Sequence, residues 1–166
     1  PEACVAGFGC HLDRYSPPPD RKQPPGYATF RSKTWDISYR LKRIGQQLRE
    51  GRFRTMAPKP LRQPVARPGR TDILYGYAGA CVRPRFFDDA FYDIPDDIWM
   101  VDDVWLSGHF ARKDIPIWLH GRTPLPQQAG NVHRSPLNAS IFDGAKRSQL
   151  DRKAISYFQQ TYGIWR

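Results

Sequence analysis

Two stretches, YGYAGACVRPRFF at residues 75–87 and WMVDDVWLSGHF at residues 99–110, decide how the chain folds. Residues 88–103 begin directly after the first stretch and extend into the second. They hold seven of the sixteen acidic side chains and no Lys or Arg. This segment carries −7 in a chain of net charge +10, so the remaining residues carry +17. Acidic side chains gathered in this way within a basic chain indicate a specific structural or chemical role.

The second stretch predicts a helix that begins near residue 102. Apolar or small residues recur at i, i+3, i+4 and i+7 from Val101 to Gly108, which is the spacing of one buried helical face. Asp102 and Asp103 would then lie in the first turn, where the helix dipole favours a carboxylate by about 0.3–1 kcal/mol. A purely structural role at the helix start therefore remains one interpretation of this acidic pair.

The first stretch predicts a strand that bends. Residues 73–82 are rich in apolar and aromatic side chains, but Gly76 and Gly79 interrupt them. A glycine inside a strand usually marks a bulge, or the close approach of a ligand or another backbone. We therefore expect a bend that faces a substrate.

The rest of the chain predicts an α/β protein. Short strands are expected at residues 3–6 and 114–119, and a helix over 146–162 that stops at Gly163. Pro116 predicts that the second of these strands lies at an edge or a bulge of its sheet. With sixteen Pro and thirteen Gly, we expect a single domain over residues 1–166, with a mixed sheet, flanking helices and long loops.

Two basic segments lie before the glycine-bearing strand. Residues 40–49 predict a short amphipathic helix with Leu41, Ile44 and Leu48 on one face, whose basic side is either solvated or contacts a membrane surface or a polyphosphate. Residues 56–70 carry four Pro and four basic side chains. They predict a mobile basic loop that could close over a site for anionic ligands.

Composition limits the classes of protein to consider. No run of about 18 apolar residues is present, so nothing in the sequence predicts a membrane-spanning helix. Three cysteines without a Cys-x-x-Cys pair argue against a disulfide framework or a zinc ribbon, although a Cys4–Cys10 bridge stays open. The sequence pI near 9.9 predicts attraction to polyanions. We expect a cytoplasmic protein, peripheral at a membrane if the helix at 40–49 binds one.

The order of these features resembles the acceptor-side half of family 2-like GT-A glycosyltransferases. YGYAGACVRPRFF resembles the glycine-bearing strand that lines the acceptor pocket in that family, and WMVDDVWLSGHF resembles the helix that opens with its acidic pair. The resemblance is best over residues 73–118. It implies the C-terminal part of a nucleotide-diphospho-sugar transferase fold, and transfer of a sugar from a nucleotide-sugar donor to an acceptor hydroxyl with inversion.

The same resemblance implies roles for individual residues. Asp103 matches the catalytic base of the inverting members, and Asp102 would support it or meet the acceptor. Trp105 would either stack on a sugar or fill the core, and its place on the inward helical face favours the core. The pocket-lining residues implied by the glycine-bearing strand are Tyr75, Gly76, Tyr77 and Gly79.

The family also holds the donor diphosphate through a divalent metal, Mn or Mg, bound by an Asp-x-Asp motif. This sequence has no such motif in the right context. The resemblance therefore implies that the chain begins just after that motif, that the main metal ligands lie outside it, and that the isolated chain could be inactive. A late histidine can add a metal ligand, and His120 is the best placed, followed by His133.

Two other functions remain open. A basic module could bind nucleic acid or an anionic glycan, with Tyr and Trp for stacking, but the seven carboxylates would repel a phosphate backbone, so nucleic acid is the less expected partner. A metal-dependent hydrolase could use clustered carboxylates as ligands, namely Asp96, Asp97, Asp102 and Asp103.

Overall fold

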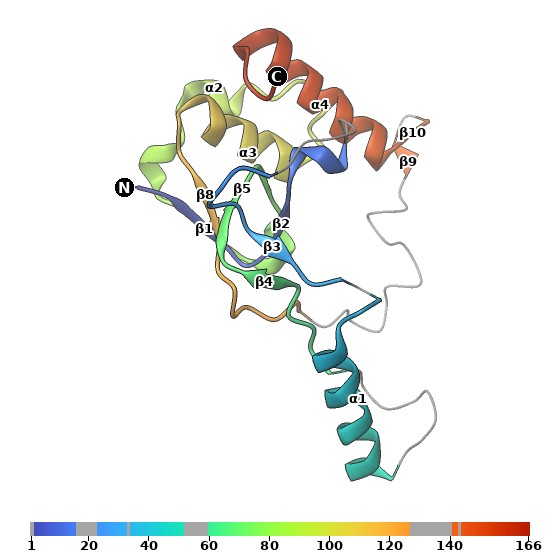
Figure 1. Cartoon of the computed structure of the whole chain (residues 1–166). Coiled ribbons are helices and arrows are strands. Elements are labelled where there is room, and N and C mark those ends of the chain that lie inside the picture. Colours follow the sequence, from blue (N-terminus) through green and yellow to red (C-terminus); the bar gives the residue numbers. More distant parts are fainter. Residues whose placement is uncertain (1, 16–22, 33, 52–59, 127–140, 143) are drawn as a thin grey trace.

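The computed structural model describes residues 2–15, 23–32, 34–51, 60–126, 141–142 and 144–166 (Figure 1). These residues form a mixed α/β fold, as the sequence predicts. Its main sheet has the strand order β5-β8-β1-β7, with β1 (Cys4–Ala6) parallel to β8 (Ile117–Leu119). The two outer strands, β5 (Gly69–Thr71) and β7 (Ala80–Cys81), pair antiparallel with their neighbours.

Three smaller strand pairs complete the β-structure. All three are antiparallel, and they comprise β2 (Gly9–Cys10) with β6 (Ile73–Leu74), β3 (Thr29–Phe30) with β4 (Val65–Arg67), and β9 (Ile141–Phe142) with β10 (Ala145–Lys146). The pair of β2 and β6 lies next to the main sheet because β2 follows β1 and β6 follows β5 closely along the chain (Figure 1).

Four α-helices are present in the described residues. They are α1 (Ile37–Glu50), α2 (Asp89–Tyr92), α3 (Asp102–Arg112) and α4 (Arg147–Tyr162), with short 3-10 turns at η1 (Leu12–Arg14), η2 (Gly76–Ala78) and η3 (Pro84–Phe86). The helices predicted around 102 and over 146–162 are thus confirmed. Gly163 adopts the left-handed conformation, with φ of 66°, that ends α4. No helix among the described residues is long and apolar enough to cross a membrane.

Helix α3 connects the two hydrophobic cores. Its face with Val104 and Trp105 packs in a cluster with Phe158 of α4. Phe110, near its C-terminal end, belongs to the second cluster, which includes Leu119 of the main sheet. Because α3 is buried on both sides, its start is held in a fixed position relative to β6 and α4.

The structure corrects three of the predictions. The strand with Pro116 is not at an edge: β8 lies between β5 and β1, and Pro116 precedes it and accepts a hydrogen bond from the backbone N–H of Cys4 (3.0 Å). The proposed mobile loop at 56–70 is wrong for its last part, since β4 and β5 pair there with β3 and β8; residues 56–59 lie outside the described residues. The run at 73–82 is two strands separated by η2.

Helix α1 extends away from the rest of the molecule (Figure 1). The sequence predicts it, although it begins earlier, at Ile37. Asp36 caps its start by accepting a hydrogen bond from the backbone N–H of Tyr39 (3.1 Å), and Gly51 ends it with φ of 61°. Cys4, Cys10 and Cys81 are all free thiols, so the open Cys4–Cys10 bridge is not formed.

Candidate functional site

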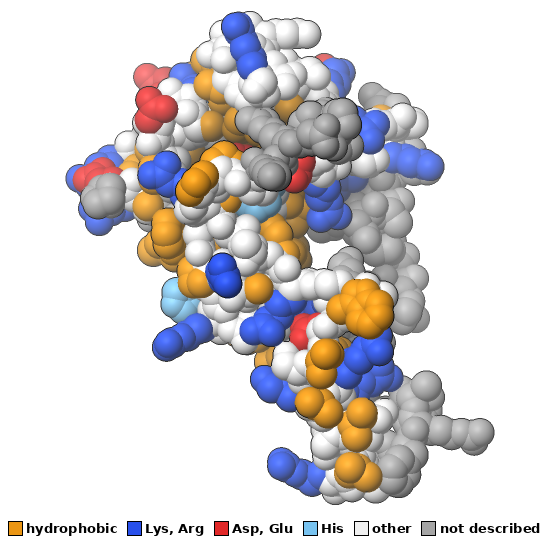
Figure 2. Space-filling model, in the orientation of Figure 1, with side chains coloured by type: hydrophobic (Ala, Val, Ile, Leu, Met, Phe, Trp, Pro, Cys, Tyr) orange, Lys and Arg blue, Asp and Glu red, His pale blue; other side chains and the backbone are white. Residues whose placement is uncertain are grey.

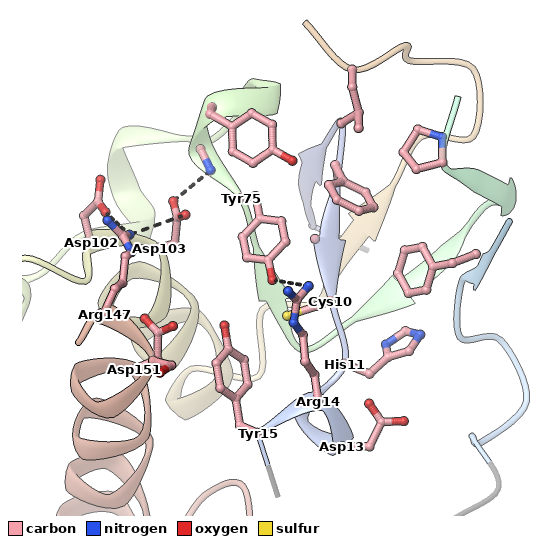
Figure 3. A pocket seen from close by; sticks show the side chains of 18 of the residues that line it. Cys10, His11, Asp13, Arg14, Tyr15, Tyr75, Asp102, Asp103, Arg147 and Asp151 are labelled. Atoms are coloured by element: carbon pink, nitrogen blue, oxygen red, sulfur yellow. Dashed lines mark hydrogen bonds and ion pairs between the residues drawn. The ribbon is translucent and has the colours of Figure 1, made fainter. Parts of the chain in front are cut away.

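A pocket of about 1010 Å³ opens between β2, η1, the bend after β6, and the first turns of α3 and α4 (Figure 3). Its walls therefore come from parts of the chain that are far apart in sequence. The charged and aromatic side chains that line it are Phe8, Asp13, Arg14, Tyr15, Phe30, Arg31, Arg62, Tyr75, Tyr77, Asp102, Asp103, Arg147, Asp151 and Arg152.

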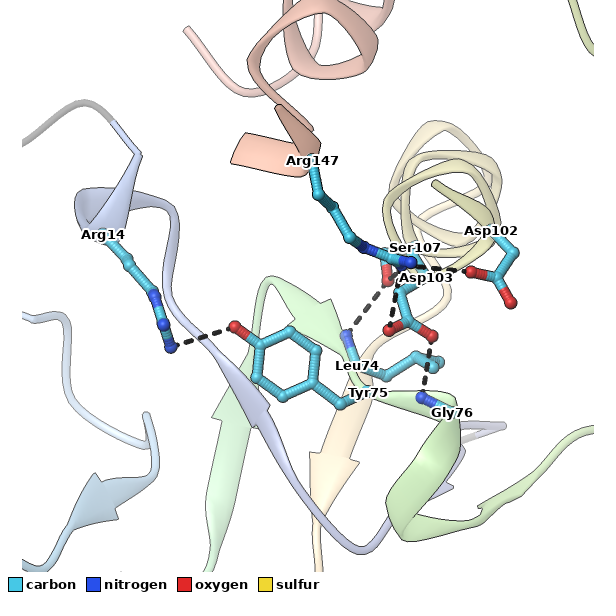
Figure 4. Close-up of polar contacts among 8 residues, drawn as sticks. All are labelled: Arg14, Leu74, Tyr75, Gly76, Asp102, Asp103, Ser107 and Arg147. Atoms are coloured by element: carbon cyan, nitrogen blue, oxygen red, sulfur yellow. Dashed lines mark hydrogen bonds and ion pairs between the residues drawn. The ribbon is translucent and has the colours of Figure 1, made fainter. Parts of the chain in front are cut away.

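Asp103 lies in the wall of this pocket rather than in solvent. Its side chain is 17% exposed, whereas that of Asp102 is 81% exposed. One carboxylate oxygen, Oδ1, accepts a hydrogen bond from the backbone N–H of Gly76 (2.8 Å), and the other, Oδ2, lies 4.0 Å from Nη2 of Arg147 (Figure 4). The helix start has no side-chain cap. Asp103 therefore connects α3 to the glycine-bearing bend instead of capping its own helix.

Ser107 fixes the distance between α3 and that bend. Its hydroxyl donates to the backbone carbonyl of Asp103 (2.6 Å) and accepts from the backbone N–H of Leu74 (3.0 Å) (Figure 4). The side chain is fully buried. The sequence stretch contains this serine, but its role depends on a contact 33 residues away, which helical spacing does not reveal.

The environment of Asp103 makes its carboxylate more basic than usual. Burial raises its pKa most, the Gly76 N–H lowers it, Asp102 raises it, Arg147 lowers it, and Asp151 raises it, with a net pKa above the ordinary value of 3.8. The raised pKa means that Asp103 is a better proton acceptor than an exposed aspartate, provided that the pH keeps it ionised.

Gly76 favours the close approach of this carboxylate. A Cβ atom at Gly76 would lie 3.0 Å from Oδ1 of Asp103, closer than most carbon–oxygen contacts allow. Gly79 ends η2 with φ of 83°, a conformation that other residues rarely adopt. The predicted bend is therefore present, and its first glycine faces the acidic side chain.

The bend also gives the pocket an aromatic wall. The rings of Tyr75 and Tyr77 stack with their centroids 5.9 Å apart, and Phe8 lies 5.5 Å from Tyr75. Tyr77 is 60% exposed. The hydroxyl of Tyr75 accepts a hydrogen bond from Nη1 of Arg14 (3.1 Å). An exposed aromatic surface beside hydrogen-bonding groups suits a ligand with both apolar and hydroxyl faces.

Helix α4 adds charged residues that sequence reasoning missed. Arg147 and Asp151, one helical turn apart, both line the pocket, and Arg147 lies 3.3 Å from Oδ1 of Asp102. Burial raises the pKa of Asp151, while Arg147, a hydrogen bond from Tyr15 and the charge of Arg14 lower it, and the net direction is upward. Their i, i+4 spacing places them on one face of the predicted helix, and this is the signal in the sequence that could have found them.

Three residues implied by the resemblance lie outside the pocket. Trp105 is 3% exposed in the core, and its indole N–H donates to the backbone carbonyl of Phe91 (2.8 Å), so the core interpretation is right and sugar stacking is not available to it. Gly79 is exposed but does not line the pocket. His120 is exposed after β8, beside Thr123. His133 lies outside the described residues.

Much of the acidic segment forms ion pairs with neighbouring elements. Asp88 contacts Arg112 and Lys113 at the end of α3, and Asp97 lies 2.6 Å from Nζ of Lys153 on α4. Burial raises the pKa of Asp88, but Lys113 and Arg112 lower it by more, so the pKa lies below its ordinary value. The segment thus helps to hold α3 and α4 together, and of its seven aspartates Asp102 and Asp103 line the pocket.

The described residues of this pocket show no cluster of metal ligands. They hold no group of three or more His, Cys, Asp or Glu side chains arranged to bind an ion. Asp102 and Asp103 both lie near the guanidinium of Arg147, which offsets part of their charge. The metal implied by the resemblance, whose main ligands would lie outside this chain, stays a prediction.

Comparison of the chain with protein-family models, with curated proteins and with solved structures finds no match. The functional interpretation therefore depends on the pocket itself and on the motifs that line it.

Proposed function

We propose that this chain forms the acceptor side of a nucleotide-sugar-dependent glycosyltransferase, with Asp103 as the general base. One observation supports this most. The Asp103 carboxylate is largely buried in the wall of a large pocket, directly beside the glycine-interrupted aromatic segment that would line an acceptor site. An acidic pair with a purely structural role would not need its second member to face a cavity.

The proposed reaction requires one general base next to the hydroxyl group that receives the sugar. Oδ1 of Asp103 is occupied by the Gly76 N–H, so Oδ2 is the oxygen that would take the proton. As it does so, the hydroxyl oxygen forms a bond to the anomeric carbon of the donor sugar. The bond from that carbon to the nucleotide diphosphate breaks, and the diphosphate leaves with the electron pair. Attack opposite the leaving group inverts the anomeric centre.

The other pocket residues suit binding of the acceptor. Tyr75 and Tyr77 offer ring faces for the C–H surface of a sugar, and Arg147 holds the acidic pair in place. Removing the acceptor from water also strengthens each of these polar contacts. The raised pKa of Asp103 further favours proton transfer from a weakly acidic hydroxyl.

The test compares Asp103→Asn with Asp102→Asn in a polypeptide or complex that also supplies the nucleotide-binding half. Asparagine keeps the shape and can still accept the Gly76 N–H, but it cannot take a proton. We expect Asp103→Asn to lower kcat by about 10²–10⁴-fold, with the thermal unfolding midpoint close to that of the parent. Nucleotide release from the donor in the presence of acceptor measures the turnover.

Asp102→Asn is the matched control, because this side chain is 81% exposed. It should change kcat far less. The parent activity should also decrease as the pH falls through the raised pKa of Asp103, since protonation removes the base. An Asp103→Asn protein that folds and keeps most of its turnover would refute the assignment.

A further inference from the structure

Helix α1 carries a continuous apolar stripe that the described chain leaves uncovered. Ile37, Leu41, Ile44 and Leu48 are spaced at i, i+4, i+7 and i+11, which places them on one helical face. Their exposed fractions are 67%, 63%, 52% and 60%. Figure 2 shows hydrophobic side chains along this helix, where it extends from the body. Four large aliphatic side chains exposed in a row indicate a surface that meets an apolar phase or partner.

The charges of this helix are mainly positive, with Glu50 at its end as its acidic residue. Residues 37–49 contain four basic side chains and no acidic one, and helical geometry places the basic residues beside and behind the stripe. They are Arg40, Lys42, Arg43 and Arg49. In the first turn, the opposite face of the helix contacts the body, since the guanidinium of Arg62 lies 5.9 Å from the ring centre of Tyr39. The apolar stripe therefore points away from this contact, with cations beside and behind it.

We propose that α1 docks on an anionic lipid surface, with its apolar stripe among the upper acyl chains and its basic residues at the headgroups. A helix with a strong apolar face, low overall hydrophobicity and bordering Lys or Arg binds in the plane of a membrane interface in this way. Each basic residue near an anionic surface adds attraction, which salt weakens. The sequence alone favoured a solvated helix face over a membrane contact, and the orientation of the exposed stripe now favours the membrane.

A second copy of the chain fits this surface less well. Two α1 stripes packed together around a twofold axis would bring together two helices that each carry four basic residues and one acidic residue, Glu50. An anionic lipid surface instead compensates the same charges. This inference does not rest on the glycosyltransferase proposal, because lipid binding needs neither donor nor acceptor.

Docking would also hold the pocket close to the membrane. Arg31 and Arg62 line the pocket, and they contact Ser38 and Tyr39 in the first turn of α1. A helix of this length spans about 20 Å. An anionic surface bound along α1 would therefore lie within about one helix length of the pocket.

The experiment measures co-sedimentation of the full chain with phosphatidylcholine vesicles and with vesicles of equimolar phosphatidylcholine and phosphatidylglycerol. We expect the wild-type chain to bind the anionic vesicles at low salt and to dissociate as salt rises. Leu41→Ser with Leu48→Ser should weaken binding at least about tenfold. Lys42→Gln with Arg43→Gln should weaken binding to the anionic vesicles on the order of tenfold or more.

Tyr92→Ser is the matched control, because Tyr92 is 70% exposed on α2, at the other end of the molecule from α1. It should bind like the wild type. All the altered side chains are exposed, so far-ultraviolet circular dichroism should show folded protein in each case. No binding to anionic vesicles at low salt would overturn the proposal. Binding that the variant with both serine substitutions retains would also overturn it. A dimer of the wild type in gel filtration that this variant no longer forms would overturn it too, because the stripe would then be an interface between two copies.

Discussion

Helix α1 and the interface between α3 and α4 both place apolar side chains at helical spacing, but they differ in what covers those side chains. Val104 and Trp105 of α3 meet Ala154 and Phe158 of α4, and all four are nearly inaccessible to solvent. The aliphatic residues of α1 are all more than half exposed. The same sequence pattern thus produces a core in one region and a free surface in the other.

This difference shows that periodicity predicts a helix and its apolar face, but not the partner of that face. In the body, tertiary packing stabilises the helices. In α1, local features carry most of the stability, namely the Asp36 cap at its start and the left-handed Gly51 at its end. Equivalent substitutions in the two regions should therefore have very different effects, and they provide the means to test the comparison.

The largest expected difference is between Phe158→Ala and Leu48→Ala. Phe158 is fully buried against Trp105 and His109, so its removal leaves a cavity and should lower the free energy of unfolding by about 3–5 kcal/mol. Leu48 is 60% exposed, and its removal should change that free energy by less than about 0.5 kcal/mol. Urea unfolding followed by tryptophan fluorescence measures both. Similar losses for the two variants would contradict the distinction between the regions.

A second difference concerns pH, because the body contains a buried titratable histidine and α1 contains none. His109 is 1% exposed between the aromatic rings of α3 and α4. Burial lowers its pKa most; Arg112 and Lys113 lower it further, and Asp88, 4.0 Å away, raises it, for a value of about 4. In the unfolded chain, His109 takes up a proton as the pH falls below its ordinary pKa of 6.5. In the folded protein, it takes up this proton only at about pH 4.

The free energy of unfolding should therefore decrease as the pH falls from 6.5 to 4, and His109 should add no further change outside this window. The two pKa values correspond to a loss of about 3 kcal/mol. Urea unfolding at several pH values should give a steeper decrease for the wild type than for His109→Leu. His120→Gln, at an exposed histidine, is the control and should follow the wild type. Parallel curves for the wild type and His109→Leu would show that His109 is not the group responsible.

The sequence predicted helices α1, α3 and α4 and strands β1, β6, β7 and β8 because their signals are local. Helical spacing, Gly163 and the first strand required no knowledge of the rest of the chain. The position of β8 could not be predicted in this way, since its partner β5 lies 46 to 50 positions earlier along the chain, with Thr71 opposite Ile117 and Gly69 opposite Leu119. The strands at 65–67 and 69–71 were missed because Pro64 and Pro68 beside them are typical of loops.

The residues of the candidate site show the same division between local signals and long-range contacts. Asp103 and the glycines of the bend were found because each carries a strong local signal, a carboxylate at a helix start or a glycine in a strand. Ser107, Tyr15 and Asp151 were not found, because they act through contacts between distant segments. The sequence left two roles open for Trp105, stacking on a sugar and filling the core, and its burial shows that it belongs to the core. Sequence reasoning thus identifies the candidate acidic residue more readily than the residues that surround it.

The smallest expected effects come from the two helical glycines, which compare the regions most directly. A Cβ at Gly108 of α3 would overlap the ring of Phe158, whereas a Cβ at Gly45 of α1 meets nothing within 4 Å. Gly108→Ala should therefore destabilise the body by about 1–3 kcal/mol. Gly45→Ala should stabilise α1 by about 0.5–1 kcal/mol, because alanine loses less backbone entropy in a helix.

Hydrogen exchange separates the two outcomes. Gly108→Ala should speed amide exchange throughout α3 and α4 and lower the urea midpoint. Gly45→Ala should slow exchange in α1 alone and leave the urea midpoint of the body unchanged, since α1 extends away from the rest of the molecule (Figure 1). If Gly45→Ala instead raised the midpoint of the whole protein, α1 would unfold together with the body, and its exposed stripe would belong to the same cooperative unit as the core.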